Sequence, residues 1–287
     1  MSEQTFRSVR SPMRLMAVHA HPDDESSKGA ATLARYAAQG VEVLVVTCTG
    51  GERGDVLNAA LDRPEIRADL PAVRRREMAA AAAVLGVRQQ FLGYTDSGLP
   101  GEGEPLPEGC FALQPVDEAA ERLQTVIQEF RPHVVVTYDP TGGYPHPDHV
   151  QTHRVALAAF EGAAAQAWQP AKLYYLAALS REWFTALHRA MTDREIPSAL
   201  GEMLDNWPDW APEFEVTTRV ACSEYFSARD AALRAHATQA DPGHPFFAHP
   251  RDLEREVWPT EDYVLARGSA GGTLPETDLF AGVPVTG

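Results

Sequence analysis

Cysteine is scarce in this sequence of 287 residues. Its three cysteines, Cys48, Cys110 and Cys222, are odd in number and form no CxxC pair. The sequence therefore predicts neither a disulfide framework nor a cysteine zinc site, and the pattern is typical of a protein from a reducing cytoplasm.

Long apolar runs are also missing. No stretch of about 18 apolar residues occurs, which argues against a membrane-spanning helix. Residues 1–13 contain Arg7 and Arg10, but no apolar run follows them that could act as the core of a signal peptide. We therefore expect a soluble, cytoplasmic protein.

Positive charge is in deficit, with 25 Lys and Arg against 40 Asp and Glu and a formal net charge of −15. Nucleic acids and anionic lipid surfaces are themselves negative, so this balance argues against both as partners. A small-molecule substrate is favoured, and nothing in the sequence indicates an oligomeric state.

Short apolar runs alternate with helical patterns over residues 15–178, which is typical of α/β proteins. Strands are predicted at 15–18, 41–46, 90–92, 133–137 and 173–177. Helices are predicted between them at 26–39, 70–85, 116–130 and 148–161. We predict a Rossmann-like, doubly wound and mostly parallel sheet.

Beyond residue 178 the alternation weakens. Tryptophans gather at Trp183, Trp207 and Trp210, strands are predicted at 214–220 and 263–266, and a helix is predicted at 223–238. We expect a catalytic, metal-binding domain over 1–178 and a smaller α+β cap over 179–287 that shapes a pocket. The last residues, 268–287, are rich in Gly, Pro and Thr and predict irregular structure.

Two clusters of His and Asp follow predicted strands. The first strand runs into HAHPDDE at 19–25, and the fourth runs toward YPHPDH at 144–149. Ligands of open parallel sheets bind outside the carboxyl ends of strands, so we expect the clusters to face each other. Imidazole and carboxylate donors suit Zn²⁺ or Fe²⁺, and a catalytic zinc site needs three protein ligands and one open position.

Simpler interpretations exist for parts of these clusters. Asp24 or Ser26 could cap the following helix, and Asp148 could do the same for the helix entered at His149. His153 could be a further ligand, although a residue on the helix surface or one that supports a ligand is favoured, and His19 is expected to pack beside the site or to orient it. No role is predicted for the histidines near the C-terminus. The sequence holds no GxGxxG after the first strand, no GxxxxGK[ST] and no GxSxG, so nucleotide binding and serine catalysis are not indicated.

At these residues the sequence resembles the LmbE-like (PIG-L) superfamily of metal-dependent N-acetylglucosamine deacetylases, in which AHPDDE is paired with a later HPDH. Within the superfamily it is more similar to the amidase branch that acts on mycothiol conjugates. The resembling segments lie over most of the chain, at 18–36, 43–58, 91–100, 108–115, 142–149 and 258–268.

The resemblance implies a catalytic centre. One zinc ion per chain would be held by His21, Asp24 and His149. Asp23 would be the general base, and His146 would stabilise the oxyanion or protonate the leaving amine.

The resemblance also implies supporting and substrate-binding residues. Asp148 would orient His146 and Tyr144 would close over the carbonyl. Arg74, Asp96 and Asp55 match positions that bind the sugar.

Lys28 resembles the amidase branch and would help to accommodate a larger thiol conjugate. Alternatively, Lys28 is an exposed residue in the first turn of a helix, where a cation gains nothing from the helix dipole. Arg74 belongs to a run of three arginines, 74–76, which is often a solvated helix face.

The resemblance implies a zinc-dependent amidase that hydrolyses the amide between glucosamine and N-acetylcysteine in mycothiol S-conjugates. The products would be a mercapturic acid and glucosaminyl-inositol. Fe²⁺ suits the same donors. The alternatives are a deacetylase of N-acetylglucosaminyl-inositol or another N-acetyl sugar, and a metal-dependent binding module without turnover.

Overall fold

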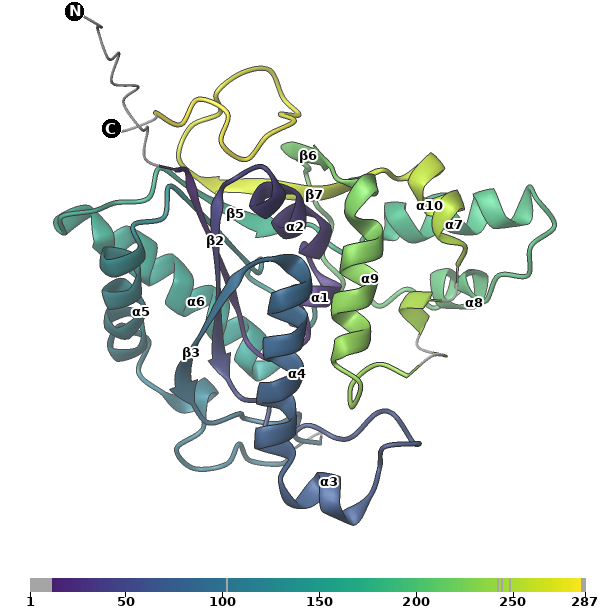
Figure 1. The fold of residues 1–287 in the computed structure, drawn as a ribbon, viewed down its shortest axis with the longest axis horizontal. Helices are drawn as coiled ribbons and strands as arrows, with labels where there is room; N and C mark the ends of the chain where they lie inside the picture. Colours follow the sequence, from purple (N-terminus) through teal and green to yellow (C-terminus); the bar gives the residue numbers. More distant parts are fainter. Residues whose placement is uncertain (1–11, 102, 242, 244, 248, 285–287) are drawn as a thin grey trace, which may run out of the picture.

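A computed structural model describes residues 12–101, 103–241, 243, 245–247 and 249–284. Within them, seven strands form one sheet in the order β3-β2-β1-β4-β5-β7-β6 (Figure 1). The strands are β1 (Arg14–His19), β2 (Glu42–Thr49), β3 (Arg88–Tyr94), β4 (Val134–Thr137), β5 (Lys172–Leu176), β6 (Thr218–Ala221) and β7 (Thr260–Arg267). β1 to β5 pair in parallel, whereas β7 is antiparallel to both β5 and β6.

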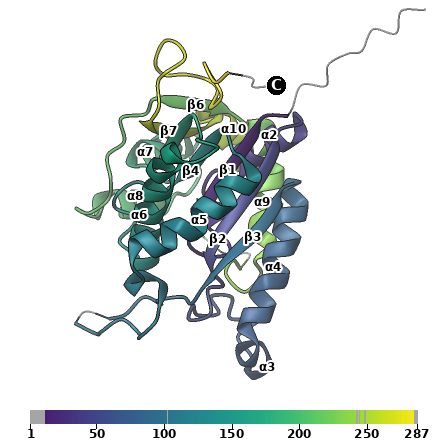
Figure 2. The same cartoon turned by 90° about the vertical axis from the view of Figure 1, so that its left-hand side faces the viewer.

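Helices cover both faces of this sheet. They are α1 (Asp24–Ser27), α2 (Ala30–Ala38), α3 (Pro64–Ala68), α4 (Leu70–Leu85), α5 (Val116–Phe130), α6 (Pro147–Gly162), α7 (Arg181–Thr192), α8 (Leu200–Asp205), α9 (Phe226–Ala235) and α10 (Arg251–Val257). Short 3₁₀ turns lie at Phe111–Leu113, Ala163–Ala165, Ser223–Tyr225 and Pro245–Phe247. Figures 1 and 2 show α5 and α6 on one side of the sheet, with α2 and α4 on the other.

The position of the central strands within the core explains why their sequences are continuous apolar runs. Along β1, Met16 and Val18 pack toward α5 and α6, whereas Leu15 and Ala17 pack toward α2 and α4. A strand that is buried on both faces needs apolar residues at every position rather than at alternate ones. The predicted α/β fold with a mostly parallel sheet is confirmed.

The first predicted helix, 26–39, is divided in two. Gly29 separates α1 from α2 with a φ of +87°, in the left-handed region. A Cβ at Gly29 would lie 3.0 Å from Leu176 Cδ2 and 3.2 Å from the Tyr263 hydroxyl oxygen. The backbone therefore turns here against β5 and β7, a contact that helical periodicity does not reveal.

The C-terminal strands differ most from the sequence prediction. The strand expected at 214–220 is β6 at Thr218–Ala221, and the strand expected at 263–266 begins earlier, at Thr260. β7 pairs with β5 and β6 pairs with β7, so both strands extend the main sheet. The division at residue 178 stays a proposal, with the sheet continuing across it.

Part of the region after residue 178 has a hydrophobic cluster of its own. α7, α8 and α10 share a cluster around Trp183, Leu187 and Leu253. Among the helices described here, none has the combination of length and apolar character needed to cross a bilayer.

Candidate metal centre

Two loops meet where the winding direction of the sheet reverses. β1 lies between β2 and β4. From β1 the chain continues outward through β2 to β3 on one side. It then returns to β4, on the other side of β1, and continues outward to β5. The HPDDE segment leaves the carboxyl end of β1, and the segment beginning at Tyr138 leaves the carboxyl end of β4. Adjacent strand ends at such a reversal form the crevice that binds ligands in open α/β sheets.

Three buried side chains converge in this crevice. His21, Asp24 and His149 each offer a ligand atom, and these atoms lie within 4.8 Å of one another. Asp24 Oδ2 is 3.3 Å from His149 Nε2 and 3.5 Å from His21 Nδ1. The structure thus brings together the three predicted metal ligands.

His149 is oriented for a cation. Its Nδ1 lies 2.9 Å from the Gly142 carbonyl oxygen, which can only accept a hydrogen bond, so Nδ1 carries a proton and Nε2 is the atom directed at Asp24. That Nε2 is buried and has no hydrogen-bond partner within the described structure. The ring stacks on Tyr138 with centroids 4.4 Å apart. Gly142 has a φ of +78°, and a Cβ there would lie 2.6 Å from His149 Cβ, so glycine permits the approach.

His21 is held by a second carboxylate. Its Nε2 lies 3.1 Å from Asp148 Oδ2, which leaves Nδ1 facing Asp24. A carboxylate behind a ligating histidine fixes the tautomer and makes the imidazole a better donor. Burial lowers the pKa of His21, but Asp148, Asp24 and Asp96 together raise it well above its usual value. The surroundings of this ring therefore favour positive charge.

Asp24 is ionised in these surroundings. Burial opposes ionisation, yet His149 and Lys28 hold the pKa of its carboxyl well below its usual range. Lys28 Nζ lies 2.7 Å from Asp24 Oδ1, and the Lys28 side chain is 12% exposed. Lys28 is thus not the exposed helix residue of the simpler interpretation; it is the C-cap of α1 and contacts a predicted metal ligand.

Asp23 adopts a strained conformation beside the three ligands. Its φ of +105° lies in the left-handed region, which is uncommon for a residue other than glycine. Arg74 Nη2 lies 3.0 Å from Asp23 Oδ2 and donates to the Pro22 carbonyl at 2.7 Å. Burial raises the pKa of Asp23, and Arg74 opposes that rise. A carboxylate with a raised pKa, adjacent to a metal site, suits a general base.

Arg74 is buried, unlike its neighbours Arg75 and Arg76, which are exposed. Its Nη1 donates to the Gly51 carbonyl at 2.9 Å, and a Cβ at Gly51 would lie 2.1 Å from that nitrogen. The glycine-rich loop after β2 therefore leaves the space that the Arg74 guanidinium occupies. This finding excludes a solvated helix face for Arg74, although not for the other two arginines.

His146 and Asp148 are arranged differently from what the family resemblance implied. The backbone N–H of Asp148 donates to His146 Nδ1 at 3.1 Å, as His146 caps α6. The Asp148 carboxylate instead contacts His21 and accepts hydrogen bonds from the backbone N–H and hydroxyl of Ser97. His146 and Asp148 also form, with His21, a second group of possible ligand atoms within 4.8 Å.

His146 and Tyr144 are neutral hydrogen-bond donors near the ligands. Burial, with His21 and His149 nearby, lowers the pKa of His146 to about 4. Because its Nδ1 accepts a hydrogen bond, the proton of the neutral ring lies on Nε2. Burial also raises the pKa of Tyr144, whose ring centroid lies 4.6 Å from that of His149.

Comparison with known proteins agrees with this geometry. The family model described as PIG-L, GlcNAc-PI de-N-acetylase, matches residues 16–160. The chain belongs to the PIG-L family. A mycothiol S-conjugate amidase of Streptomyces coelicolor is 52% identical to this PIG-L protein over 286 residues, covering 94% of this chain and 97% of the relative.

A second relative of this PIG-L protein is named for a different activity. The 1D-myo-inositol 2-acetamido-2-deoxy-alpha-D-glucopyranoside deacetylase of Streptomyces avermitilis is 43% identical over 288 residues, covering 94% of this chain and 97% of the relative. The chain is therefore an amide hydrolase of the family. A conserved protein of Thermus thermophilus has the same fold, with a TM-score of 0.59, 22% identity and coverage of 92% and 98% of the two chains.

The predicted sugar-binding residues are divided between two environments in this PIG-L protein. Asp96 is buried, accepts from the backbone N–H groups of Arg53 and Gly98, and lies 3.5 Å from His21. Burial opposes its ionisation, but His21 and these N–H groups lower its pKa. Asp55 is exposed on the loop after β2, where its backbone carbonyl accepts a hydrogen bond from Gln239.

Two other histidines near the centre are not among its donor groups. His153 is buried, and its Nδ1 lies 3.0 Å from the Tyr138 carbonyl oxygen. It is therefore not on the helix surface. His19 is fully buried beside Tyr138, and burial lowers its pKa to about 4. Both positions agree with a packing role.

The sequence interpretation missed the pair formed by Glu25 and His236. His236 Nε2 lies 2.7 Å from Glu25 Oε1, and both residues are fully buried. Glu25 Oε2 accepts the backbone N–H of Asp23 at 3.0 Å. Glu25 thus holds the strained backbone of Asp23 and is itself held by His236, which is 211 positions away from Glu25. Glu25 is the last residue of the AHPDDE motif, and this position could have indicated a role for it. Nothing in the sequence identified His236 as its partner.

Loss of this pair should destabilise the protein in a pH-dependent way. Burial opposes charge on both groups, but each partner outweighs it, raising the pKa of His236 above 6.5 and lowering that of Glu25 below 4.5. The stabilisation contributed by His236 is complete below about pH 6.5 and is lost as pH rises through the pKa of His236 in the folded protein. The glutamate contribution is complete above about pH 4.5 and is lost as pH falls through its folded value.

We therefore expect His236→Ala to lower the free energy of unfolding by about 3–5 kcal/mol between about pH 5 and 6, because it leaves a buried carboxylate unpaired. The difference from the unmodified protein should shrink at alkaline pH. Denaturant unfolding across pH measures it. His188→Ala is the control, since His188 contacts the Ser198 hydroxyl rather than a carboxylate. A His236→Ala effect that does not change with pH would contradict a charged pair.

Proposed function

We propose that this protein hydrolyses the amide between glucosamine and N-acetylcysteine in mycothiol S-conjugates, releasing a mercapturic acid and glucosaminyl-inositol. The observation that carries the proposal is the convergence of His21, Asp24 and His149 with the Asp23 carboxylate beside them. The relative at 52% identity, a mycothiol S-conjugate amidase, supports this substrate.

The donor set fits one Zn²⁺ or Fe²⁺ per chain. Two imidazoles and one ionised carboxylate are suited to either metal and leave positions for water and substrate. The buried, unpartnered Nε2 of His149 supports this assignment. A bound metal ion would polarise the amide carbonyl and lower the pKa of a coordinated water.

The residues around the donors supply the proton transfers. Asp23, held by Arg74, would accept the proton of the attacking water. Tyr144 and the Nε2–H of His146 would donate hydrogen bonds to the oxyanion of the tetrahedral intermediate. Because His146 is neutral at pH 7, oxyanion stabilisation is the role that its surroundings favour, and the Asp23 carboxyl would return the proton to the leaving amine.

The sugar would lie toward the loops that follow β2 and β3. Asp96 is buried there beside His21, and Asp55 lies on the exposed rim. Arg74 is already bonded to three neighbouring groups, so its main effect on substrate would come through Asp23 and the Gly51 backbone.

Incubation with the bimane conjugate of mycothiol, after loading with Zn²⁺ or Fe²⁺, tests the proposal. We expect release of the glucosaminyl-inositol amine together with the bimane mercapturate. The second candidate substrate is N-acetylglucosaminyl-inositol, which the relative at 43% identity supports. The values of kcat/KM for the two substrates decide between them, and a higher value for the N-acetyl sugar would overturn the proposal.

A further inference from the structure

A cavity of about 300 Å³ opens beside the metal centre between β5 and the start of the cap. Its walls include Phe184, Met203, Trp207, Trp210 and Phe214, and we call it the aromatic cavity. An engineered apolar cavity of about 150 Å³ binds benzene. The aromatic cavity is therefore large enough for a group of one or two rings.

Two residues of the metal centre line this cavity. Tyr144 lies against His149, and Lys28 contacts Asp24. A second cavity of about 290 Å³ shares Lys28, Leu179, Phe184 and Met203 with it but is lined by Asp23 instead of Tyr144. Asp23 would act on the attacking water and Tyr144 on the acyl carbonyl. The acyl part of the substrate would thus lie beside Tyr144 and extend into the aromatic cavity.

The walls of the aromatic cavity suit an apolar ligand. Trp210 is 50% exposed and lies between Pro208 and Pro212, which restrict the backbone around it. The Trp207 ring packs on Phe184 with centroids 5.7 Å apart. A ligand that covers exposed indole gains the hydrophobic free energy, and a restricted loop loses little entropy on binding.

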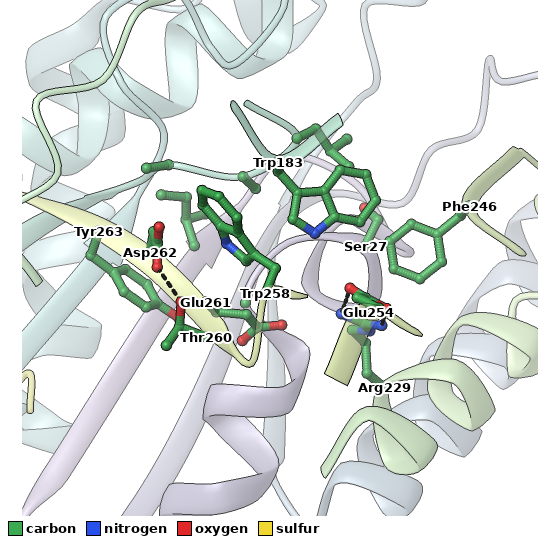
Figure 3. Close-up of a pocket in the computed structure, with 15 residues that line it drawn as sticks. Ser27, Trp183, Arg229, Phe246, Glu254, Trp258, Thr260, Glu261, Asp262 and Tyr263 are labelled. Carbon is green, nitrogen blue, oxygen red and sulfur yellow. Dashed lines mark hydrogen bonds and ion pairs between the residues drawn. The ribbon is translucent and has the colours of Figure 1, made fainter. Parts of the chain in front are cut away.

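A third pocket in this region is small and contains charged side chains. A smaller pocket of about 50 Å³ lies behind Trp183 and Phe246, where Arg229 and Glu254 form a bidentate pair with N–O distances of 3.0 and 2.7 Å (Figure 3). A bulky apolar group does not fit this small, charged pocket. Of the two larger cavities, the aromatic cavity is therefore the one that Tyr144 lines.

We propose that the aromatic cavity binds the group carried on the sulfur of the substrate, and that Trp207 and Trp210 make the enzyme select alkyl and aryl groups there. The inference rests on the proposed function. A small or polar S-group would leave the cavity hydrated, whereas each buried methylene should raise kcat/KM by about fourfold.

The test compares S-benzyl with S-methyl conjugates of mycothiol for the metal-loaded protein, Trp210→Ala and Trp207→Ala. We expect Trp210→Ala to lower the ratio of the two kcat/KM values by about tenfold and Trp210→Phe to restore most of it. Leu274→Ala is the control, because Leu274 is equally exposed at 53% but lies in the C-terminal tail. The control should leave the ratio unchanged.

Binding of the products separates the inference from the proposed function. Calorimetry measures Kd for N-acetyl-S-benzylcysteine and N-acetyl-S-methylcysteine, whatever reaction the protein catalyses. We expect tighter binding of the benzyl compound, with the advantage reduced in both tryptophan variants. Equal affinities, or an advantage that survives in both variants, would overturn the aromatic cavity as the subsite. Failure to hydrolyse either conjugate would instead count against the proposed function.

Discussion

Asp23→Asn should lower kcat by about 10²- to 10⁴-fold while leaving the metal content of the protein unchanged. The amide has the shape of the carboxylate and its oxygen can still accept a hydrogen bond from Arg74. It cannot accept a proton from water. Steady-state kinetics with a mycothiol S-conjugate, together with elemental analysis of metal per chain, measure both quantities.

A matched control separates base catalysis from loss of charge. Asp62 is an exposed carboxylate paired with Arg67, outside the metal centre, and Asp62→Asn should retain full activity. If Asp23→Asn kept more than about a tenth of the activity, Asp23 would not be the base. If it lost the metal as well, its role would lie in forming the site rather than in proton transfer.

His149→Ala should abolish turnover by removing one of the three proposed metal ligands. Substitutions of residues that merely support a ligand lower metal affinity by about 10- to 100-fold, so we expect a loss of more than about 100-fold here. Adding Zn²⁺ or Fe²⁺ after chelation should raise Tm and restore activity in the unmodified protein, because a ligand that binds the folded state stabilises it. The same addition should leave His149→Ala unchanged.

Two further variants make this test specific. His153 lies four residues along α6, is also buried, and contacts a backbone carbonyl, so His153→Ala should keep its metal. His146→Ala distinguishes the two groups of donor atoms. Loss of metal in His146→Ala but not in His149→Ala would place the ion among His21, His146 and Asp148 instead.

The sequence predicted the parallel half of the fold because its central strands are buried on both faces. The edge strand β3 was predicted as only 90–92 although it spans Arg88–Tyr94. Its exposed and half-buried residues, such as Arg88 and Gln89, interrupt the apolar run. The antiparallel strands β6 and β7 were placed imperfectly for a similar reason, since their burial is partial and their pairing with β5 depends on distant residues.

The convergence of the two His and Asp clusters could be expected, since each follows one of two adjacent strands. The contacts within the centre could not. Asp148 contacts His21 across 127 residues, and His236 contacts Glu25 across 211 residues. Motif spacing identifies which residue types gather, whereas side-chain packing between remote segments decides which atoms meet.

The contact between Glu25 and His236 also links the two regions of the chain. A fragment ending at residue 178 would lack the imidazole that neutralises Glu25, so the turn that carries Asp23 would enclose an uncompensated negative charge. The same truncation would uncover the hydrogen-bonding edge of β5 that β7 occupies. We therefore expect that residues 12–178 would not fold as an autonomous module, and that exchanging the C-terminal regions of relatives would require the residue at position 236 to be transferred together with the motif it supports.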